Sequence, residues 1–192
     1  MTWWTGLASL QFPRNLPTSP VPQVGDKAPA DGNIILPIDG KYTIITFLRH
    51  CGCPFAEKTF LDLRSLAASN PSVQFVAVSH SDELSTNNWL SAVGGAGSIK
   101  MITDPERELY AGWGLGVSSW FHFLSPTAMW SAYQLAKDGI TNRPTESGNR
   151  WQTAGSFAVD QDDIVRYAHV AQHAGDVPDF EKVLELVDVK GL

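Results

Sequence analysis

The sequence predicts an α/β fold of three layers, in which a mixed central sheet lies between helices. Short apolar strands alternate with amphipathic helices over residues 43–113, which is typical of parallel β-α-β units. Near the end of the chain, two strands joined by a polar turn indicate an antiparallel hairpin. An aromatic-rich stretch between these two regions predicts a helical insertion.

The first strand and helix are the clearest elements. TIITFLR, residues 43–49, is a continuous β-branched and aromatic run, as expected of a buried central strand. A helix is expected over 54–69, because Pro54 suits the first helical position and apolar residues recur at helical spacing until Asn70-Pro71. Cys53 therefore stands at the N-cap of this helix.

The remaining elements follow from the same patterns. We expect strands at 72–79, 98–103, 155–160 and 164–170, and helices at 82–93, 105–113, 126–138 and 178–187. Asp104 comes directly before the helix that opens at Pro105, so it is better explained as a helix cap than as a catalytic acid.

Two regions differ from the regular pattern. Residues 1–41 are rich in proline and show little periodicity, which predicts an N-terminal arm packed on a domain formed by 42–192. Residues 116–151 are too long for a simple connection and form the insertion. Its aromatic side chains form either a satellite core under a long loop, or a pocket wall or dimer face. In the second case the substrate-binding residues are Trp120, Phe121, Trp130, Trp151 and the nearby Thr153.

The charge balance excludes several function classes. The formal net charge is -6 and no run of Lys or Arg occurs, so the footprint of a nucleic-acid or anionic-membrane binder is missing. No segment approaches the roughly 20 apolar residues of a membrane span, and the first residues lack the basic region of a secretory signal. We expect a cytoplasmic protein.

Both cysteines of the chain, Cys51 and Cys53, lie within three positions of RHCGCPF. In open α/β sheets, reactive groups collect beyond the carboxyl ends of strands, which is where Cys53 falls. A thiolate there faces unpaired helix N–H groups and the positive end of the helix dipole, and both stabilise the charged form. Arg49 and His50 precede the pair and add positive charge.

Cys51 is the expected resolving partner of Cys53. The Cα atoms of residues two apart lie roughly 5.5 to 7 Å from each other, which overlaps the range that a disulfide accepts. Gly52 supplies backbone freedom for such a small ring, whose strain favours a catalytic or regulatory pair over a structural one. Two simpler interpretations remain open: inert buried cysteines, and half of a metal site. No metal is expected, because the other histidines show no ligand-like spacing with the pair.

The chain resembles the thioredoxin superfamily and, within it, the peroxiredoxin-like AhpC/TSA group, which includes prostamide/prostaglandin F synthase-like members. The resemblance rests on VGDKAP (24–29), TFLRHCGCPF (46–55), DPERELYAGWGLG (104–116) and GSFAVDQDDIVRYAHV (155–170). It implies a thioredoxin-like fold and places Cys53 at the nucleophilic cysteine of the group. Arg150 or Arg49 would be the arginine that peroxiredoxins bring to the thiolate.

The chain also departs from the patterns of this superfamily. Ala56 stands where the second cysteine of a Cys-x-x-Cys pair would be, and Thr46 and His50 replace the Pro and Thr of the usual peroxiredoxin signature. At the cis-proline position of thioredoxins the chain has Thr153, Ala154 and Gly155.

Three functions remain open at this point. The first is a thiol-dependent oxidoreductase that reduces a peroxide, endoperoxide or disulfide through Cys53 and Cys51, with His50 relaying a proton. It would bind no cofactor, would be recycled by an external thiol such as glutathione or thioredoxin, and would be a monomer or a homodimer. The second is an enzyme of specialised metabolism that acts on an apolar small molecule without net redox turnover. The third is a thioredoxin-fold binding module without catalysis.

Overall fold

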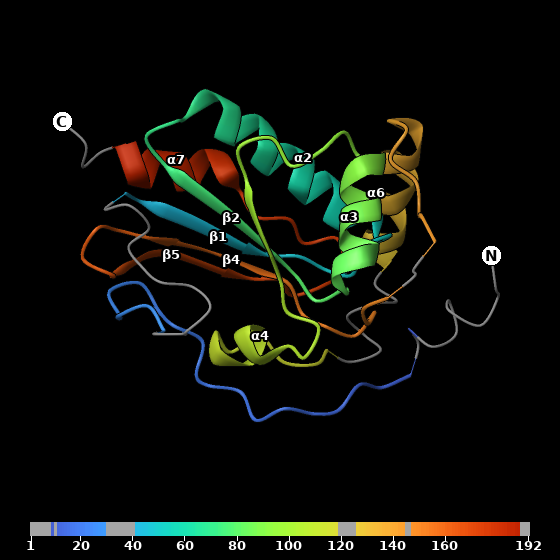
Figure 1. Ribbon diagram of the computed structural model, residues 1–192, viewed down its shortest axis with the longest axis horizontal. Coiled ribbons are helices and arrows are strands. Elements are labelled where there is room, and N and C mark those ends of the chain that lie inside the picture. Colours follow the sequence, from blue (N-terminus) through green and yellow to red (C-terminus); the bar gives the residue numbers. More distant parts are fainter. Residues whose placement is uncertain (1–8, 10, 30–40, 119–125, 145–146, 189–192) are drawn as a thin grey trace.

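The computed structural model describes residues 9, 11–29, 41–118, 126–144 and 147–188. Five of its strands form one mixed sheet in the order β3-β2-β1-β4-β5 (Figure 1). The parallel strands are β1 (Thr43–Phe47), β2 (Gln74–Ser79) and β3 (Lys100–Thr103). The hairpin of β4 (Gly155–Val159) and β5 (Val165–Val170) runs antiparallel to β1. This arrangement confirms the predicted mixed sheet and its thioredoxin-like topology.

Helices cover both faces of the sheet (Figure 1). On one face lie α2 (Pro54–Ser69), α3 (Glu83–Ala92) and α7 (Phe180–Asp188), and on the other lies α4 (Glu108–Gly112). Each face of the sheet has its own hydrophobic core, and alternate residues of β1 pack into one or the other. Ile44 packs into the core on the α2 side, whereas Ile45 packs into the core on the α4 side. The strand is buried along its whole length, which explains its continuous apolar sequence.

Helix α4 is shorter than the sequence predicted. It begins at Glu108 instead of Pro105, because Arg107 adopts a left-handed backbone with φ of 63° and interrupts the helical path. Asp104 still satisfies the first turn, since its carboxylate accepts hydrogen bonds from the N–H groups of Glu108 (3.1 Å) and Tyr110 (3.2 Å). The assignment of Asp104 as a cap is therefore correct in function, although the helix boundary was wrong.

The aromatic insertion leaves the domain and returns to it at one place. Val117 pairs with Gln152 in an isolated bridge, and the N–H of Ser118 donates to the carbonyl of Trp151 (2.7 Å). Between these ends, α6 (Pro126–Lys137) packs beside α2, as the sequence predicted for a helix at 126–138. The segment after α6 leads back over the turn between β1 and α2, where it shapes the candidate site.

The N-terminal segment lies along the α4 side of the domain (Figure 1). The N–H of Ser19 donates to the carbonyl of Ala111 (2.9 Å), and Lys27 forms a bridge with Ile164 beside the hairpin. Within the described part of the chain, no helix is long and apolar enough to cross a membrane.

Candidate functional site

The site is built around the turn that joins β1 to α2. Cys53 is the N-cap of α2, as predicted, with an extended backbone (φ -74°, ψ 127°) and Pro54 directly behind it. The N–H of Cys53 donates to the carbonyl of His50 (3.1 Å), and its own carbonyl accepts from the N–H of Glu57 (3.1 Å). The Cys53 side chain makes no capping hydrogen bond, so its sulfur does not contribute to the helix cap.

Gly52 is clamped by the segment after α6. Its φ is 107°, and a Cβ at this position would lie 2.9 Å from the carbonyl oxygens of both Arg143 and Pro144. The N–H of Arg143 donates to the carbonyl of Gly52 (3.0 Å), and its guanidinium binds both carboxylate oxygens of Glu57, at 2.7 and 3.0 Å. Only glycine fits this turn, because the backbone needs positive φ and the clamp leaves no space.

The two cysteines, both free thiols, lie in different surroundings. The Cys51 sulfur is 3.5 Å from the Ser79 hydroxyl and 3.9 Å from the Thr86 hydroxyl, on the side of β2 and α3. Cys53 instead packs among Phe55, Ala56 and Ala174. Each residue is only 5% exposed. The turn therefore brings the thiols close in sequence but directs them into separate clusters.

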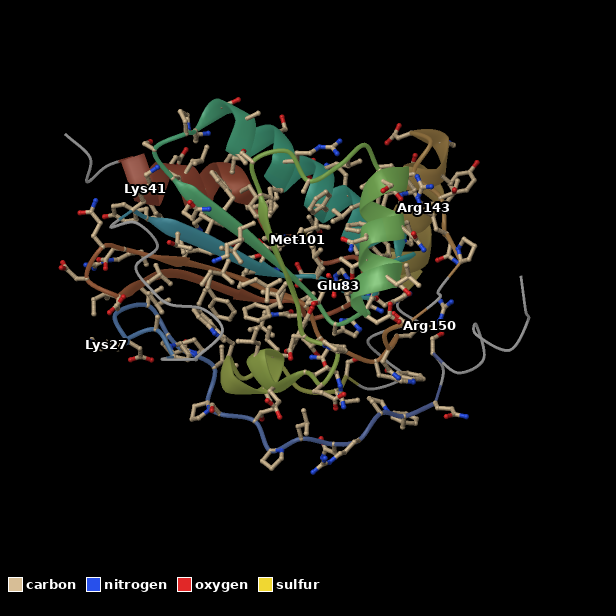
Figure 2. All side chains as sticks on the ribbon, in the orientation of Figure 1. Lys27, Lys41, Glu83, Met101, Arg143 and Arg150 are labelled. Atoms are coloured by element: carbon tan, nitrogen blue, oxygen red, sulfur yellow. The ribbon has the colours of Figure 1, made fainter. Side chains whose placement is uncertain are left out.

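Two arginines contact each other close to the turn that carries Cys53, and one of them, Arg150, interacts with Cys53. Arg49 is 3% exposed, and its Nη2 donates to the carbonyl of Arg150 (2.8 Å), while Nε of Arg150 donates to the hydroxyl of Ser9 (2.9 Å). Burial lowers the pKa of Arg150, negative charge on Cys53 raises it, and the charge of Arg49 lowers it. Arg150 and Cys53 are thus close enough to interact electrostatically. Figure 2 shows Arg143 and Arg150 on the same side of the molecule.

The remaining hydrogen-bond donors of Arg49 are also buried. Its Nε and Nη1 atoms are buried, and within the part of the chain that the structure describes they have no acceptor. Arg49 also lines a cavity of about 20 Å³ together with Thr46, Phe55, Ser156 and other residues near Cys53. A space of this size holds a water-sized group. A buried cation with two free donors is suited to bind an oxygen that carries negative charge.

His50 lies in the same cluster, in surroundings that favour its neutral form. It is 1% exposed, and its pKa is held well below the ordinary value of 6.5 by burial first, and then by Arg49, Arg150 and His80. Neither ring nitrogen has a hydrogen-bond partner among the described residues. A neutral imidazole offers one donor and one acceptor, so proton exchange is chemically open to it.

A family model described as AhpC/TSA antioxidant enzyme matches residues 61–173, which is more than half of the chain. The chain belongs to the AhpC/TSA family. The matched segment begins at Leu61, after both cysteines, so membership in the AhpC/TSA family assigns no role to either thiol. No curated protein matches the sequence significantly.

Solved structures with the same fold come from AhpC/TSA-type and related proteins. A peroxiredoxin-like protein from Aquifex aeolicus is 13% identical over 90% of both chains, with a TM-score of 0.62. A thiol peroxidase from Chromobacterium violaceum is 16% identical over 91% of both chains, with a TM-score of 0.58. Peroxiredoxin 6 of Arenicola marina is 15% identical with a TM-score of 0.55; the alignment covers 78% of this chain and 60% of that one. At these identities the comparison shows the fold.

A buried histidine and tyrosine of this AhpC/TSA protein, His80 and Tyr110, were not predicted from the sequence to lie at the site. His80 Nε2 lies 3.0 Å from the carbonyl of Asn149, and Nδ1 lies 3.4 Å from the Tyr110 hydroxyl. Burial is the largest cause that lowers the pKa of His80 to about 4. Burial also raises the pKa of Tyr110, and the charges of Asp104 and Cys51 act in the same direction. One signal was present: His80 directly follows a buried parallel strand, at the sheet edge where functional groups gather.

Of the aromatic residues proposed for substrate binding, the two that the structure describes, Trp151 and Trp130, have different surroundings. Trp151 is 1% exposed and stacks on Phe12, with ring centroids 4.6 Å apart. Trp130 is 63% exposed on α6 and lies beside Tyr133. The N–H of Thr153 donates to the carbonyl of Gly116 (3.1 Å) at the return of the insertion. Trp120 and Phe121 lie outside the described residues.

A second cavity of about 200 Å³ lies on the other side of the turn. It is lined by Cys51, Gly52, Ser85, Asn88, Trp89, Ala92, Arg143 and Pro144. It shares no lining residue with the cavity beside Arg49. Among the described residues, no three His, Cys, Asp or Glu side chains come together as a metal site would require.

Proposed function

We propose that this protein is a thiol-dependent oxidoreductase in which Cys53 is the nucleophile and Cys51 the resolving thiol. The observation that carries the proposal is the position of Cys53 at the start of α2, where it interacts with the charge of Arg150. Positive charge and unpaired helix N–H groups both stabilise a thiolate, which is the reactive form of cysteine.

The first step is attack of the Cys53 thiolate on an O–O or S–S bond. With a hydroperoxide, the sulfur forms a bond to one oxygen while the O–O bond breaks, and the released alkoxide takes a proton. Cys53 is oxidised to a sulfenic acid and the peroxide is reduced to an alcohol. In this proposal the buried Nε and Nη1 donors of Arg49, which have no acceptor among the described residues, bind the negative oxygen, and His50 transfers the proton.

The second step is attack of Cys51 on the oxidised Cys53. A Cys51–Cys53 disulfide forms, and water leaves from the sulfenic acid. Because the two thiols lie in different clusters, this step needs the Gly52 turn to move. The clamp formed by Arg143 and Pro144 opposes that movement, so we expect resolution to be slower than the first attack.

An external thiol then returns both cysteines to the reduced form. Glutathione or thioredoxin is the reductant we propose, in the cytoplasm, where such thiols are abundant. The likeness to prostamide/prostaglandin F synthase-like members makes endoperoxides one substrate class to test beside hydroperoxides and disulfides. We also propose that the exposed Trp130 and Tyr133 of α6 are the first residues to examine for a homodimer contact.

Intact mass spectrometry of the reduced protein with one equivalent of cumene hydroperoxide tests the proposal. We expect the wild type to lose two hydrogens, Cys51→Ser to gain one oxygen, and Cys53→Ser to stay unchanged. Oxidation of Cys53→Ser at the wild-type rate would overturn the assignment of the nucleophile. Inert thiols in all three proteins would favour the two alternatives, a non-redox enzyme acting on an apolar molecule or a binding module.

A further inference from the structure

The N-terminal segment holds the backbone around Arg150. The N–H of Arg150 donates to the carbonyl of Ser9 (3.2 Å), and the side-chain amide of Asn149 donates to the carbonyl of Gln11 (2.7 Å). Both acceptors are backbone oxygens. These two contacts therefore depend on the path of the N-terminal segment rather than on its side chains.

An aromatic contact lies next to these hydrogen bonds. Phe12 stacks on Trp151, with ring centroids 4.6 Å apart and ring planes 10° apart, and Trp151 is 1% exposed. Stacked aromatic rings bury a large apolar area and stabilise the contact between the segments that carry them. The residues of the N-terminal segment that make these contacts, here named the N-terminal clasp, are Ser9, Gln11 and Phe12.

Ser9 binds the side chain of Arg150 as well as its backbone. The hydroxyl of Ser9 accepts a hydrogen bond from Nε of Arg150 (2.9 Å), and Ser9 is 3% exposed. An arginine side chain has many rotamers, and a hydrogen bond to its charged group favours those that keep the contact. The Ser9 hydroxyl therefore restricts the direction in which the guanidinium points.

The segment that carries Arg150 lies against the turn before Cys53. The carbonyl of Arg150 accepts a hydrogen bond from Nη2 of Arg49 (2.8 Å), and a Cβ added at Gly148 would lie 3.1 Å from the Cβ of His50. From this position Arg150 interacts with charge on Cys53. Because the interaction between charges falls with distance, the direction of the guanidinium decides how strongly it stabilises a thiolate.

We propose that Ser9 is a positioning residue for Cys53, because its hydroxyl holds the Arg150 guanidinium at the turn where the positive charge acts on the thiolate. The inference rests on the proposed function, in which Cys53 is the nucleophile. Ser9 acts through Arg150, so removal of its hydroxyl should weaken the positive field at the sulfur and leave the thiol itself in place.

Alkylation of Cys53 in the Cys51→Ser background tests this role. Iodoacetamide and iodoacetate have the same leaving group, but only iodoacetate is an anion. The ratio of the iodoacetate rate to the iodoacetamide rate therefore reports the positive charge near the sulfur. We expect Ser9→Ala to lower this ratio about threefold, and Arg150→Ala to lower it at least as much. Ser9→Thr keeps a hydroxyl and should retain most of the ratio.

Two controls separate positioning from a general loss of structure. Gln11→Ala is the matched variant, because Gln11 is exposed and contributes its backbone carbonyl to the clasp, so the ratio should not change. In a double-mutant cycle, Ser9→Ala should have no further effect on the ratio once Arg150→Ala has removed the charge that Ser9 positions. Melting temperatures check that the variants are folded.

The outcomes are distinct. A ratio that falls in Ser9→Ala, is kept in Gln11→Ala and depends on Arg150 supports the role of Ser9. An unchanged ratio in folded Ser9→Ala, an equal effect with and without Arg150, or a Cys53 that neither probe labels overturns it. Alkylation uses no peroxide, so failure of the proposed function is seen separately, as a Cys53 that reacts with iodoacetamide but not with cumene hydroperoxide.

Discussion

The two sides of the Gly52 turn show how differently one short sequence can place two identical groups. On one side Cys53 begins a helix, packs against Phe55 and interacts with the charge of Arg150. On the other side Cys51 lies against the hydroxyls of Ser79 and Thr86 and borders a separate cavity. Contacts from distant elements therefore give two cysteines that are near neighbours in sequence different surroundings.

The largest expected effect separates the two thiols. Cys53→Ser should lower the proposed peroxide turnover by on the order of a thousandfold or more, because the reaction would lose its proposed nucleophile. Cys51→Ser should keep the first turnover and lose the later ones. Rapid-quench mass spectrometry that follows the first and the later turnovers measures both effects. Equal loss of the first turnover in the two variants would contradict the proposed division of roles.

Gly52→Ala should disturb both sides at once. The new Cβ would meet two carbonyl oxygens at 2.9 Å on a backbone with φ of 107°, so we expect a loss of about 3 kcal/mol in unfolding free energy. Gly25→Ala is the matched control, because Gly25 has φ of 100° with no atom within 4 Å of the added Cβ. It should cost about 1 kcal/mol. Urea denaturation measures the unfolding free energies of both variants. Similar losses would show that Arg143 and Pro144 do not restrict the space around Gly52.

Acid should weaken the fold through the buried His80. Its pKa is about 4 in the folded state against 6.5 when unfolded, so between these values the unfolded chain binds the extra proton. The contribution of neutral His80 to the free energy of unfolding is fully present above pH 6.5 and should fall by about 3 kcal/mol as the pH drops to 4. His50 acts in the same direction. Denaturant unfolding across this range should show a shallower slope in His80→Gln, and an unchanged slope would exclude His80 as the cause.

The smallest effect concerns the clamp itself. Arg143→Ala removes the partner of the buried Glu57 carboxylate, and we expect a loss of about 1–2 kcal/mol because Arg143 is 36% exposed and partly screened by solvent. It should also speed formation of the Cys51–Cys53 disulfide. Arg143→Lys keeps the charge but not the two-point contact, and its rate should lie between those of Arg143→Ala and the wild type. Equal disulfide rates in all three proteins would contradict a role for the clamp.

Local patterns predicted most of the fold. The TIITF run, Pro54 behind Cys53 and the turn at Gln161–Asp163 each act over a few residues, and the structure confirms the elements around them. The predicted start of α4 was wrong. The left-handed backbone of Arg107 is unusual for a residue other than glycine, and no local sequence pattern predicts it.

The site was harder to predict because its contacts are long-range. Cys53 and its N-cap position followed from the strand and helix on either side of it. The placement of Cys51 on the side of β2 and α3 could not be predicted in this way. It depends on Ser79 and Thr86, which are 28 and 35 residues away in sequence. His80 was missed for the same reason: its partners, Tyr110 and Asn149, are 30 and 69 residues away.

The contact between Ser9 and Arg150 has a consequence for biosynthesis. It joins residues 141 positions apart, and Arg150 in turn binds Arg49 through its carbonyl. A ribosome adds roughly 5–20 residues each second, so Cys53 leaves the exit tunnel roughly 5–20 s before Arg150 does. During this interval the nascent chain carries Cys53 and Arg49 without Arg150. The contacts among Ser9, Arg150 and Arg49 therefore form only after Arg150 has been made, when most of the domain is available to enclose Cys53.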